Sequence, residues 1–157
     1  MIREFNLDRE YGDLLHEMDF EIGVIEETNF YPTLLRSLKF GDQSFFQIDK
    51  KFTRAKKNKD GTWIKGEFDV IMYSSSAIAL IDIKCLPLLT DLDNLIHKKV
   101  NLFKLLHPQY ADYTFYLGIA GLAFEEGVIA AAKEHGFGLL ITKGENVEII
   151  DQHVRAY

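Results

Sequence analysis

The residues from 66 to 84 constrain the fold more than any other part of the sequence. Two runs rich in β-branched and other apolar residues, 66–73 and 77–84, are separated by three serines. This pattern predicts a β-hairpin whose tight turn lies at Ser75 and Ser76. The turn determines which residues of the two strands face each other.

This register divides the side chains of the hairpin between two faces. Asp69 lies opposite Asp82 and Glu67 opposite Lys84, so four charged side chains share one face. A slip by one residue would bury Asp82 and Lys84 without partners, which is costly. The other face is expected to be wholly apolar and to form core, with Phe68, Val70, Met72, Ala79, Ile81 and Ile83.

Two carboxylates that face each other across a ladder need a compensating charge. Like charges in this position repel, and a divalent cation or a lysine between them relieves the repulsion. Magnesium binds hard oxygen ligands, often one or two carboxylates, and leaves its other positions to water and substrate phosphate. The hairpin therefore indicates a phosphoryl-transfer site that uses Mg²⁺ or Mn²⁺.

Asp69, followed after a short hairpin by the triplet Asp82-Ile83-Lys84, resembles the PD-(D/E)XK nuclease superfamily. The resemblance covers about residues 62–150 and implies a restriction-endonuclease-like fold that acts on DNA. It implies that Asp69 and Asp82 bind the metal, that the Ile83 carbonyl completes the shell, and that Lys84 orients or activates the attacking water. Asp82 stands where the family more often has Glu, so this ligand is one methylene shorter.

The resemblance also implies site residues on two predicted helices. Apolar spacing predicts an amphipathic helix over about 8–27, and the family often takes a further metal-binding Glu from such a helix. Glu21 is favoured, and a solvated glutamate is the alternative. A second helix is expected over about 91–106, where Lys98, or its neighbour Lys99, either leans into the site or is solvated.

Glu67 has two interpretations. As the residue opposite Lys84, it either neutralises that lysine in a cross-strand ion pair or accepts a second metal ion.

Residues 50–65 form a basic stretch next to the predicted site. They include seven Lys or Arg side chains and one acidic residue, Asp60, although the net charge of the chain is −6. The negative net charge argues against non-specific coating of nucleic acid. The stretch either contacts phosphate or is a solvated hairpin whose lysines protect an edge strand. The candidate DNA contacts are Lys56, Lys57, Lys59 and Lys65.

The rest of the pattern predicts one α/β domain over residues 1–157, with an α+β mixed sheet. An Asp-Gly turn joins strands over about 45–54 and 62–73, and 77–85 completes a three-strand antiparallel meander. Residues 113–120 are apolar at both odd and even positions, as in a central parallel strand that is buried on both faces. Phe46, Phe52 and Trp63 are expected to pack against the faces of the meander rather than to stack on bases.

A helix over 124–135, which Gly136 terminates, and strands near 137–142 and 147–149 follow the central strand. The predicted order is therefore a restriction-endonuclease-like αβββαβ core with an additional C-terminal helix and strands.

Several functional classes receive no support from the sequence. Cys85 is the only cysteine, so an internal disulfide or a multi-cysteine zinc site is excluded. The segment 118–121 lacks dinucleotide-binding spacing and no P-loop lysine is present, so no organic cofactor is expected. The N-terminus has no signal-like region and no run is long enough to span a membrane. We expect a cytoplasmic protein that does not bind membranes.

Two functions remain open at this stage. The first is a metal-dependent DNA endonuclease, and the second is a catalytically inactive module that keeps the fold and binds a protein or nucleic-acid partner. An enzyme that uses the strand end at 118–121 for a small molecule has little support. A homodimer is also left open.

Overall fold

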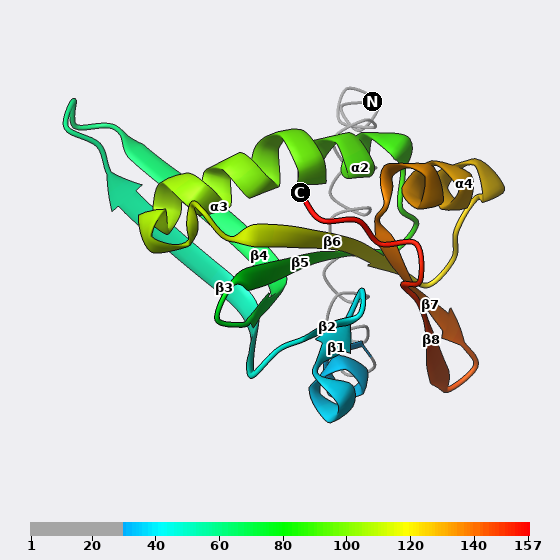
Figure 1. Ribbon diagram of the computed structural model, residues 1–157. Coiled ribbons are helices and arrows are strands. Elements are labelled where there is room, and N and C mark those ends of the chain that lie inside the picture. The colour runs from blue at the N-terminus through cyan, green and yellow to red at the C-terminus, as the bar shows by residue number, and fades with distance from the viewer. Residues whose placement is uncertain (1–29) are drawn as a thin grey trace, which may run out of the picture.

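The computed structural model describes residues 30–157 (Figure 1). In this part of the chain six strands form a mixed sheet in the order β3-β4-β5-β6-β7-β8, and two short strands form a separate ribbon. The strands are β1 (Lys39–Phe40), β2 (Gln43–Ser44), β3 (Gln47–Lys57), β4 (Trp63–Tyr73), β5 (Ala77–Lys84), β6 (Thr114–Gly121), β7 (Gly138–Lys143) and β8 (Asn146–Ile150). The predicted first helix over 8–27, with Glu21, lies outside the described residues.

The helices α2–α3 and α4 lie on one side of the curled sheet, and the β1-β2 ribbon lies on the other (Figure 1). The α+β class and the mixed sheet are therefore confirmed. Within the described residues no helix is long and apolar enough to cross a membrane. The helical segments are residues 30–37, α2 (Leu89–Asn94), a π-helical turn (Leu95–Lys99), α3 (Val100–Leu106), a 3-10 turn (Pro108–Tyr110) and α4 (Glu126–His135).

The antiparallel meander of β3, β4 and β5 is confirmed, and its second hairpin has the predicted register. Val70 pairs with Ile81, and the pairing continues to the serine turn. Ser74 stabilises this turn because its Oγ accepts a hydrogen bond from the backbone N–H of Ala77 at 2.8 Å. The paired ladder of β4 and β5 ends at Val70 and Ile81, so the pairs expected beyond this point are not part of it.

The predicted apolar face is confirmed for five of its six residues, which share one buried cluster, but the opposite face also carries core, so the prediction that charge occupies it is wrong. Ile71 and Leu80 belong to the cluster under the helices, whereas Val70 and Ile81 belong to the cluster on the opposite face. Phe68 was expected beside Val70 but packs edge-on against Phe103 of α3, with ring centroids 5.4 Å apart. This change of side coincides with the end of the β4–β5 ladder.

The strand β6 lies between β5 and β7 and is parallel to both, as predicted for a central strand. The chain reaches it from β5 through α2 and α3, and leaves it for β7 through α4. Gly136 ends α4 in the left-handed conformation, with φ of 77°, which glycine adopts at little cost. The strand β8 then pairs antiparallel with β7.

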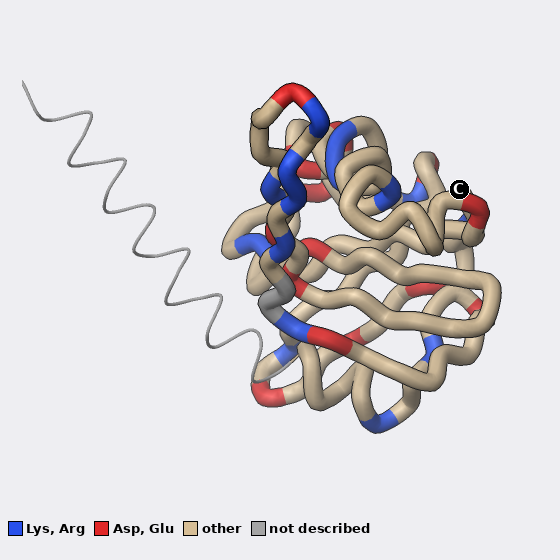
Figure 2. Tube along the Cα trace, turned by 90° about the vertical axis from the view of Figure 1, so that its left-hand side faces the viewer, with Lys and Arg blue, Asp and Glu red and all other residues tan. Residues whose placement is uncertain are grey.

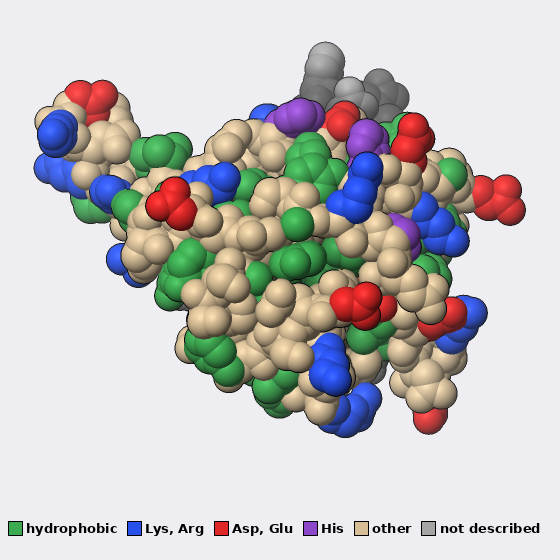
Figure 3. Space-filling view, in the orientation of Figure 1, with side chains coloured by type: hydrophobic (Ala, Val, Ile, Leu, Met, Phe, Trp, Pro, Cys, Tyr) green, Lys and Arg blue, Asp and Glu red, His purple; other side chains and the backbone are tan. Residues whose placement is uncertain are grey.

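The outer half of the β3–β4 hairpin projects from the body as an arm, defined here as residues 53–65 (Figures 1 and 3). Trp63 near its tip is 66% exposed, and Phe46, which precedes β3, is also 66% exposed. The expectation that these two rings pack against the meander is therefore wrong. The side chain of Phe52 lies outside the described part of the structure.

Replacing Gly138 by alanine should destabilise the protein by about 1–3 kcal/mol. A Cβ at this position would lie 2.2 Å from Cζ of Phe40, whose ring is fully buried and also rests on Gly118. Urea denaturation measures the change. Gly127→Ala in α4 is the control, because its Cβ would meet no atom within 4 Å and alanine favours helix. A Gly138→Ala variant as stable as the parent would contradict this packing.

Candidate metal centre

Asp69 lies where β4 and β5 separate. Its Oδ2 accepts a hydrogen bond from the backbone N–H of Ile83 at 2.8 Å. Because the β4–β5 ladder has ended at Val70, this N–H has no ladder partner on β4, and the Asp69 carboxylate takes that role. The bond holds Asp69 against β5 beside the residue that precedes Ile83, which is Asp82.

Asp82 is the most deeply buried carboxylate of the site, with 4% of its surface exposed. Burial raises its pKa from the ordinary value of 3.8 to about 6; the charges of Lys99 and Lys84 oppose this rise, and the charge of Asp69 adds to it. Among residues 30–157 no side chain or N–H forms a hydrogen bond or ion pair with this carboxylate. A buried carboxylate in this position favours a cation as its partner.

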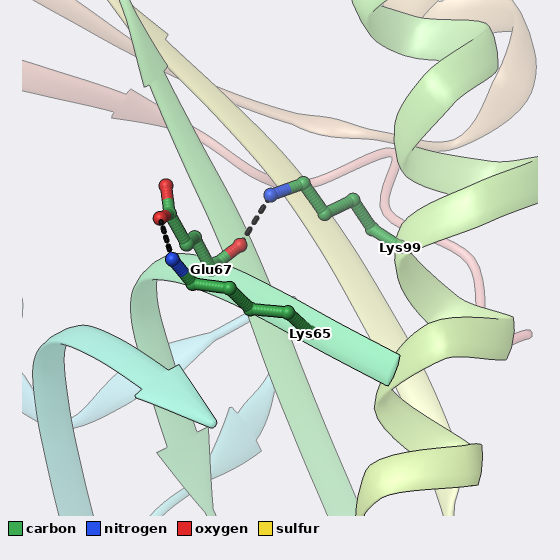
Figure 4. Close-up of polar contacts among 3 residues, drawn as sticks. All are labelled: Lys65, Glu67 and Lys99. Carbon is green, nitrogen blue, oxygen red and sulfur yellow. Dashed lines mark hydrogen bonds and ion pairs between the residues drawn. The ribbon is translucent and has the colours of Figure 1, made fainter. Parts of the chain in front are cut away.

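Lys99, rather than Lys98, is the helix lysine that reaches the site. The Nζ of Lys99 donates a hydrogen bond to the backbone carbonyl of Glu67 and lies 5.3 Å from the centre of the Phe68 ring (Figure 4). Its charge is also the one that most opposes the raised pKa of Asp82. Lys98 is exposed and lies on the helix surface with Asp93.

Helical spacing alone places Lys99 on the inner side of this helix, with Leu92, Leu95 and Phe103, and the structure agrees because Lys99 is half-buried and Lys98 is exposed. Both lysines lie in the π-helical turn Leu95–Lys99. The choice of Lys98 as the candidate therefore did not follow the spacing.

Glu67 is exposed and forms an ion pair with Lys65, its neighbour on the same strand, at 3.5 Å (Figure 4). It was expected to face Lys84 across the hairpin, and this expectation is wrong because the β4–β5 ladder ends before it reaches Glu67. Such an exposed pair contributes little to stability.

Lys84 is half-buried at the end of β5, where it pairs with Gly121 of the parallel strand β6. Its charge acts on Asp82, two residues earlier in the strand. The structure therefore brings Asp69, Asp82 and Lys84 together, as the sequence pattern predicted, and adds Lys99 from the helix above the sheet.

The donor set fits magnesium better than a metal that needs a complete protein cage. In the described part of the chain no group of three or more His, Cys, Asp or Glu could hold a metal ion. Asp69 and Asp82 supply two hard oxygen ligands, and the Ile83 carbonyl is a third candidate. Magnesium is commonly held by one or two carboxylates and keeps several waters, so this set suits it.

The predicted DNA contacts Lys56, Lys57, Lys59 and Lys65 all lie on the arm and are exposed. Figure 2 shows the arm from its outer end, with Lys and Arg following one another along it and an acidic residue at the tip. Lys65 lies on the same strand as Asp69, β4, whereas Lys56 and Lys57 lie on β3 and Lys59 lies in the turn between the two strands.

Comparison with known proteins finds no matching family model, no similar curated protein and no similar solved structure.

Proposed function

We propose that this protein is a magnesium-dependent phosphodiesterase that cleaves DNA, with a PD-(D/E)XK-like core. The observation that carries the proposal is the buried Asp82 carboxylate, which has no hydrogen-bond partner among the described residues and lies near Asp69, Lys84 and Lys99. Two carboxylates and two lysines form a mixed-charge group of the kind that phosphoryl transfer uses. The element order of the described residues is compatible with the core of that superfamily.

In this proposal Asp69 and Asp82 hold the ion, and the Ile83 carbonyl is available to complete the shell. A bound Mg²⁺ supplies Lewis-acid activation of the phosphate. Lys84 positions the attacking water and stabilises the charge that develops on the phosphoryl oxygens. As the water oxygen bonds to phosphorus, the bond from phosphorus to the leaving sugar oxygen breaks, and the proton that the water loses passes through solvent to that sugar oxygen. Lys99 contributes further positive charge.

A nuclease-fold module without activity is the second candidate. It is favoured by the positive charges of Lys99 and Lys84, which act on Asp82 and can offset the two carboxylates without a metal. Such a module would bind its partner without a divalent metal.

Titration of Mn²⁺ by calorimetry, with nicking of supercoiled plasmid measured on the same samples, tests the proposal. We expect the parent protein to bind Mn²⁺ and to nick, and the Asp69→Ala/Asp82→Ala double variant to do neither. Glu145→Gln, which changes an exposed acid in the β7–β8 turn, is the matched control and should behave like the parent. If the parent binds no Mn²⁺, the catalytic proposal fails and the inactive module remains.

A further inference from the structure

The arm differs from the rest of the molecule in charge. Its residues 53–65 include five basic side chains and one acidic side chain, whereas the whole chain has a net charge of −6. The acidic side chain, Asp60, accepts hydrogen bonds from the N–H and the hydroxyl of Thr62, so it stabilises the turn. Lys65 shares its charge with Glu67 in an exposed ion pair that a phosphate can replace. Lys56, Lys57 and Lys59 are exposed as well, so an anionic partner can reach the lysines of the arm.

The two faces of the arm have different roles. Ile64 packs against the core under the helices, and a Cβ on Gly66 would meet the side chain of Leu106 in α3. This face therefore anchors the base of the arm to the helix. The alternate residues, including Trp63 and Lys65, lie on the opposite face.

The opposite face presents an indole between basic side chains. Trp63 is 66% exposed and pairs across the ribbon with Lys57, so both side chains lie on the same face. Lys65 follows Trp63 on this face and lies opposite Ala55, a small residue that leaves room beside it. The exposed indole of Trp63 is therefore accessible to the flat face of a partner's ring.

We propose that the arm binds an unpaired DNA strand, with a base stacked on Trp63 and the phosphates next to Lys57 and Lys65. Unpaired bases expose their flat faces, and stacking on an aromatic ring tolerates any base, whereas the bases of a duplex are already stacked on one another. Trp63, Lys65 and Glu67 follow one another along β4, and Asp69 lies further along the same strand, six residues and about 20 Å from Trp63 at the usual rise of a strand.

The inference rests on the proposed nuclease function for where cleavage takes place, and it specifies the substrate as DNA with a single-stranded segment. Binding to the arm does not require the metal centre, so it can be measured in EDTA. If the arm does not bind single strands, binding in EDTA is absent. If the nuclease proposal fails, binding in EDTA remains but nicking is absent.

Trp63 is the only tryptophan in the sequence, so tryptophan fluorescence reports directly on the arm. In EDTA and at low salt, we expect oligothymidylate to quench this emission, and the same oligonucleotide annealed to its complement to bind at least about ten-fold more weakly. Equal or tighter binding of the duplex would overturn the single-strand assignment.

Fluorescence anisotropy of labelled oligothymidylate then compares variants. Trp63→Ala should weaken binding about ten-fold or more, and Trp63→Tyr should retain most of the affinity because it keeps an aromatic face. Phe46→Ala is the matched control, since Phe46 is equally exposed but lies outside the arm. Equal losses in the Trp63→Ala and Phe46→Ala variants, or no loss in Trp63→Ala, would refute the stacking role.

Three further measurements test the role of the arm apart from the metal centre and from folding. The Asp69→Ala/Asp82→Ala variant should bind oligothymidylate in EDTA as tightly as the parent, even though it no longer nicks. Lys57→Gln/Lys65→Gln should make the negative slope of log affinity against log salt less steep by about 1.4, because each phosphate contact on a single strand contributes about 0.7. An unchanged slope would exclude these lysines as phosphate contacts. Because Trp63 lies outside the core, Trp63→Ala should have the urea midpoint of the parent, and a lower midpoint would assign its effect to folding.

Discussion

Lys84→Met is expected to lower the rate of plasmid nicking by about 10²–10³-fold, while Mn²⁺ affinity stays the same or increases. In the proposed mechanism Lys84 stabilises charge that exists only in the transition state, so its loss affects catalysis more than ground-state binding. Its positive charge acts on Asp82 in the resting protein. Removing that charge leaves the two carboxylates more attractive to a cation.

The test requires calorimetry and nicking on the same preparation. Lys133→Met, on the exposed side of α4, removes an equivalent charge from a distant surface and should change neither quantity. A Lys84→Met protein that nicks at the parent rate would exclude Lys84 from the reaction. If the Lys84→Met protein loses both nicking activity and Mn²⁺ affinity, Lys84 maintains the structure of the metal site rather than taking part in the reaction.

Asp82→Asn is expected to stabilise the metal-free protein by up to about 3 kcal/mol at pH 8, although it should abolish activity. The carboxylate of Asp82 is buried, and its pKa rises from 3.8 to about 6 on folding. An acid with a raised pKa binds more protons when folded, so the parent loses stability as pH rises from about 4 to 6. Asparagine has nearly the same shape and carries no charge, so it avoids this loss.

The pH dependence distinguishes this effect from ordinary repacking. Urea denaturation in EDTA should show a difference between the parent and Asp82→Asn that grows from pH 4 to pH 6 and is constant above it. Asp93→Asn, at an exposed position of α2, is the control. Its stability difference from the parent should not grow between pH 4 and pH 6. Lower stability of Asp82→Asn at pH 8 would contradict the cost that we assign to the buried charge. Added Mn²⁺ should narrow the difference because it stabilises only the parent.

The hairpin could be predicted from the sequence because its constraints are local. Three serines between two apolar runs determine the register, and that register places Asp69 and Asp82 near each other. The parallel arrangement of β6 followed from its apolar residues on both parities, because only a strand covered on both sides has this composition. The prediction that Asp69, Asp82 and Lys84 lie close together therefore required only about twenty consecutive residues of the sequence.

Other features depended on contacts between distant segments. Alternation placed Phe68 beside Val70, but the separation of β4 from β5 turned Phe68 toward α3. The same separation removed the expected pairing of Glu67 with Lys84. No periodic pattern marks the residue at which two strands separate, because that position depends on contacts such as those of Phe68 with Phe103 and Lys99, which lie some thirty residues further along the chain.

The place where β4 and β5 separate, at Asp69, also provides a spectroscopic probe. The amide of Ile83 is bonded to one oxygen of Asp69 and follows Asp82 directly, so it lies next to both carboxylates of the centre. A cation that draws electron density from Asp69 should weaken this hydrogen bond and shift the nitrogen and proton resonances of Ile83. Titration with diamagnetic Mg²⁺ would then follow occupancy at a single backbone atom pair, whether or not any phosphodiester is cleaved.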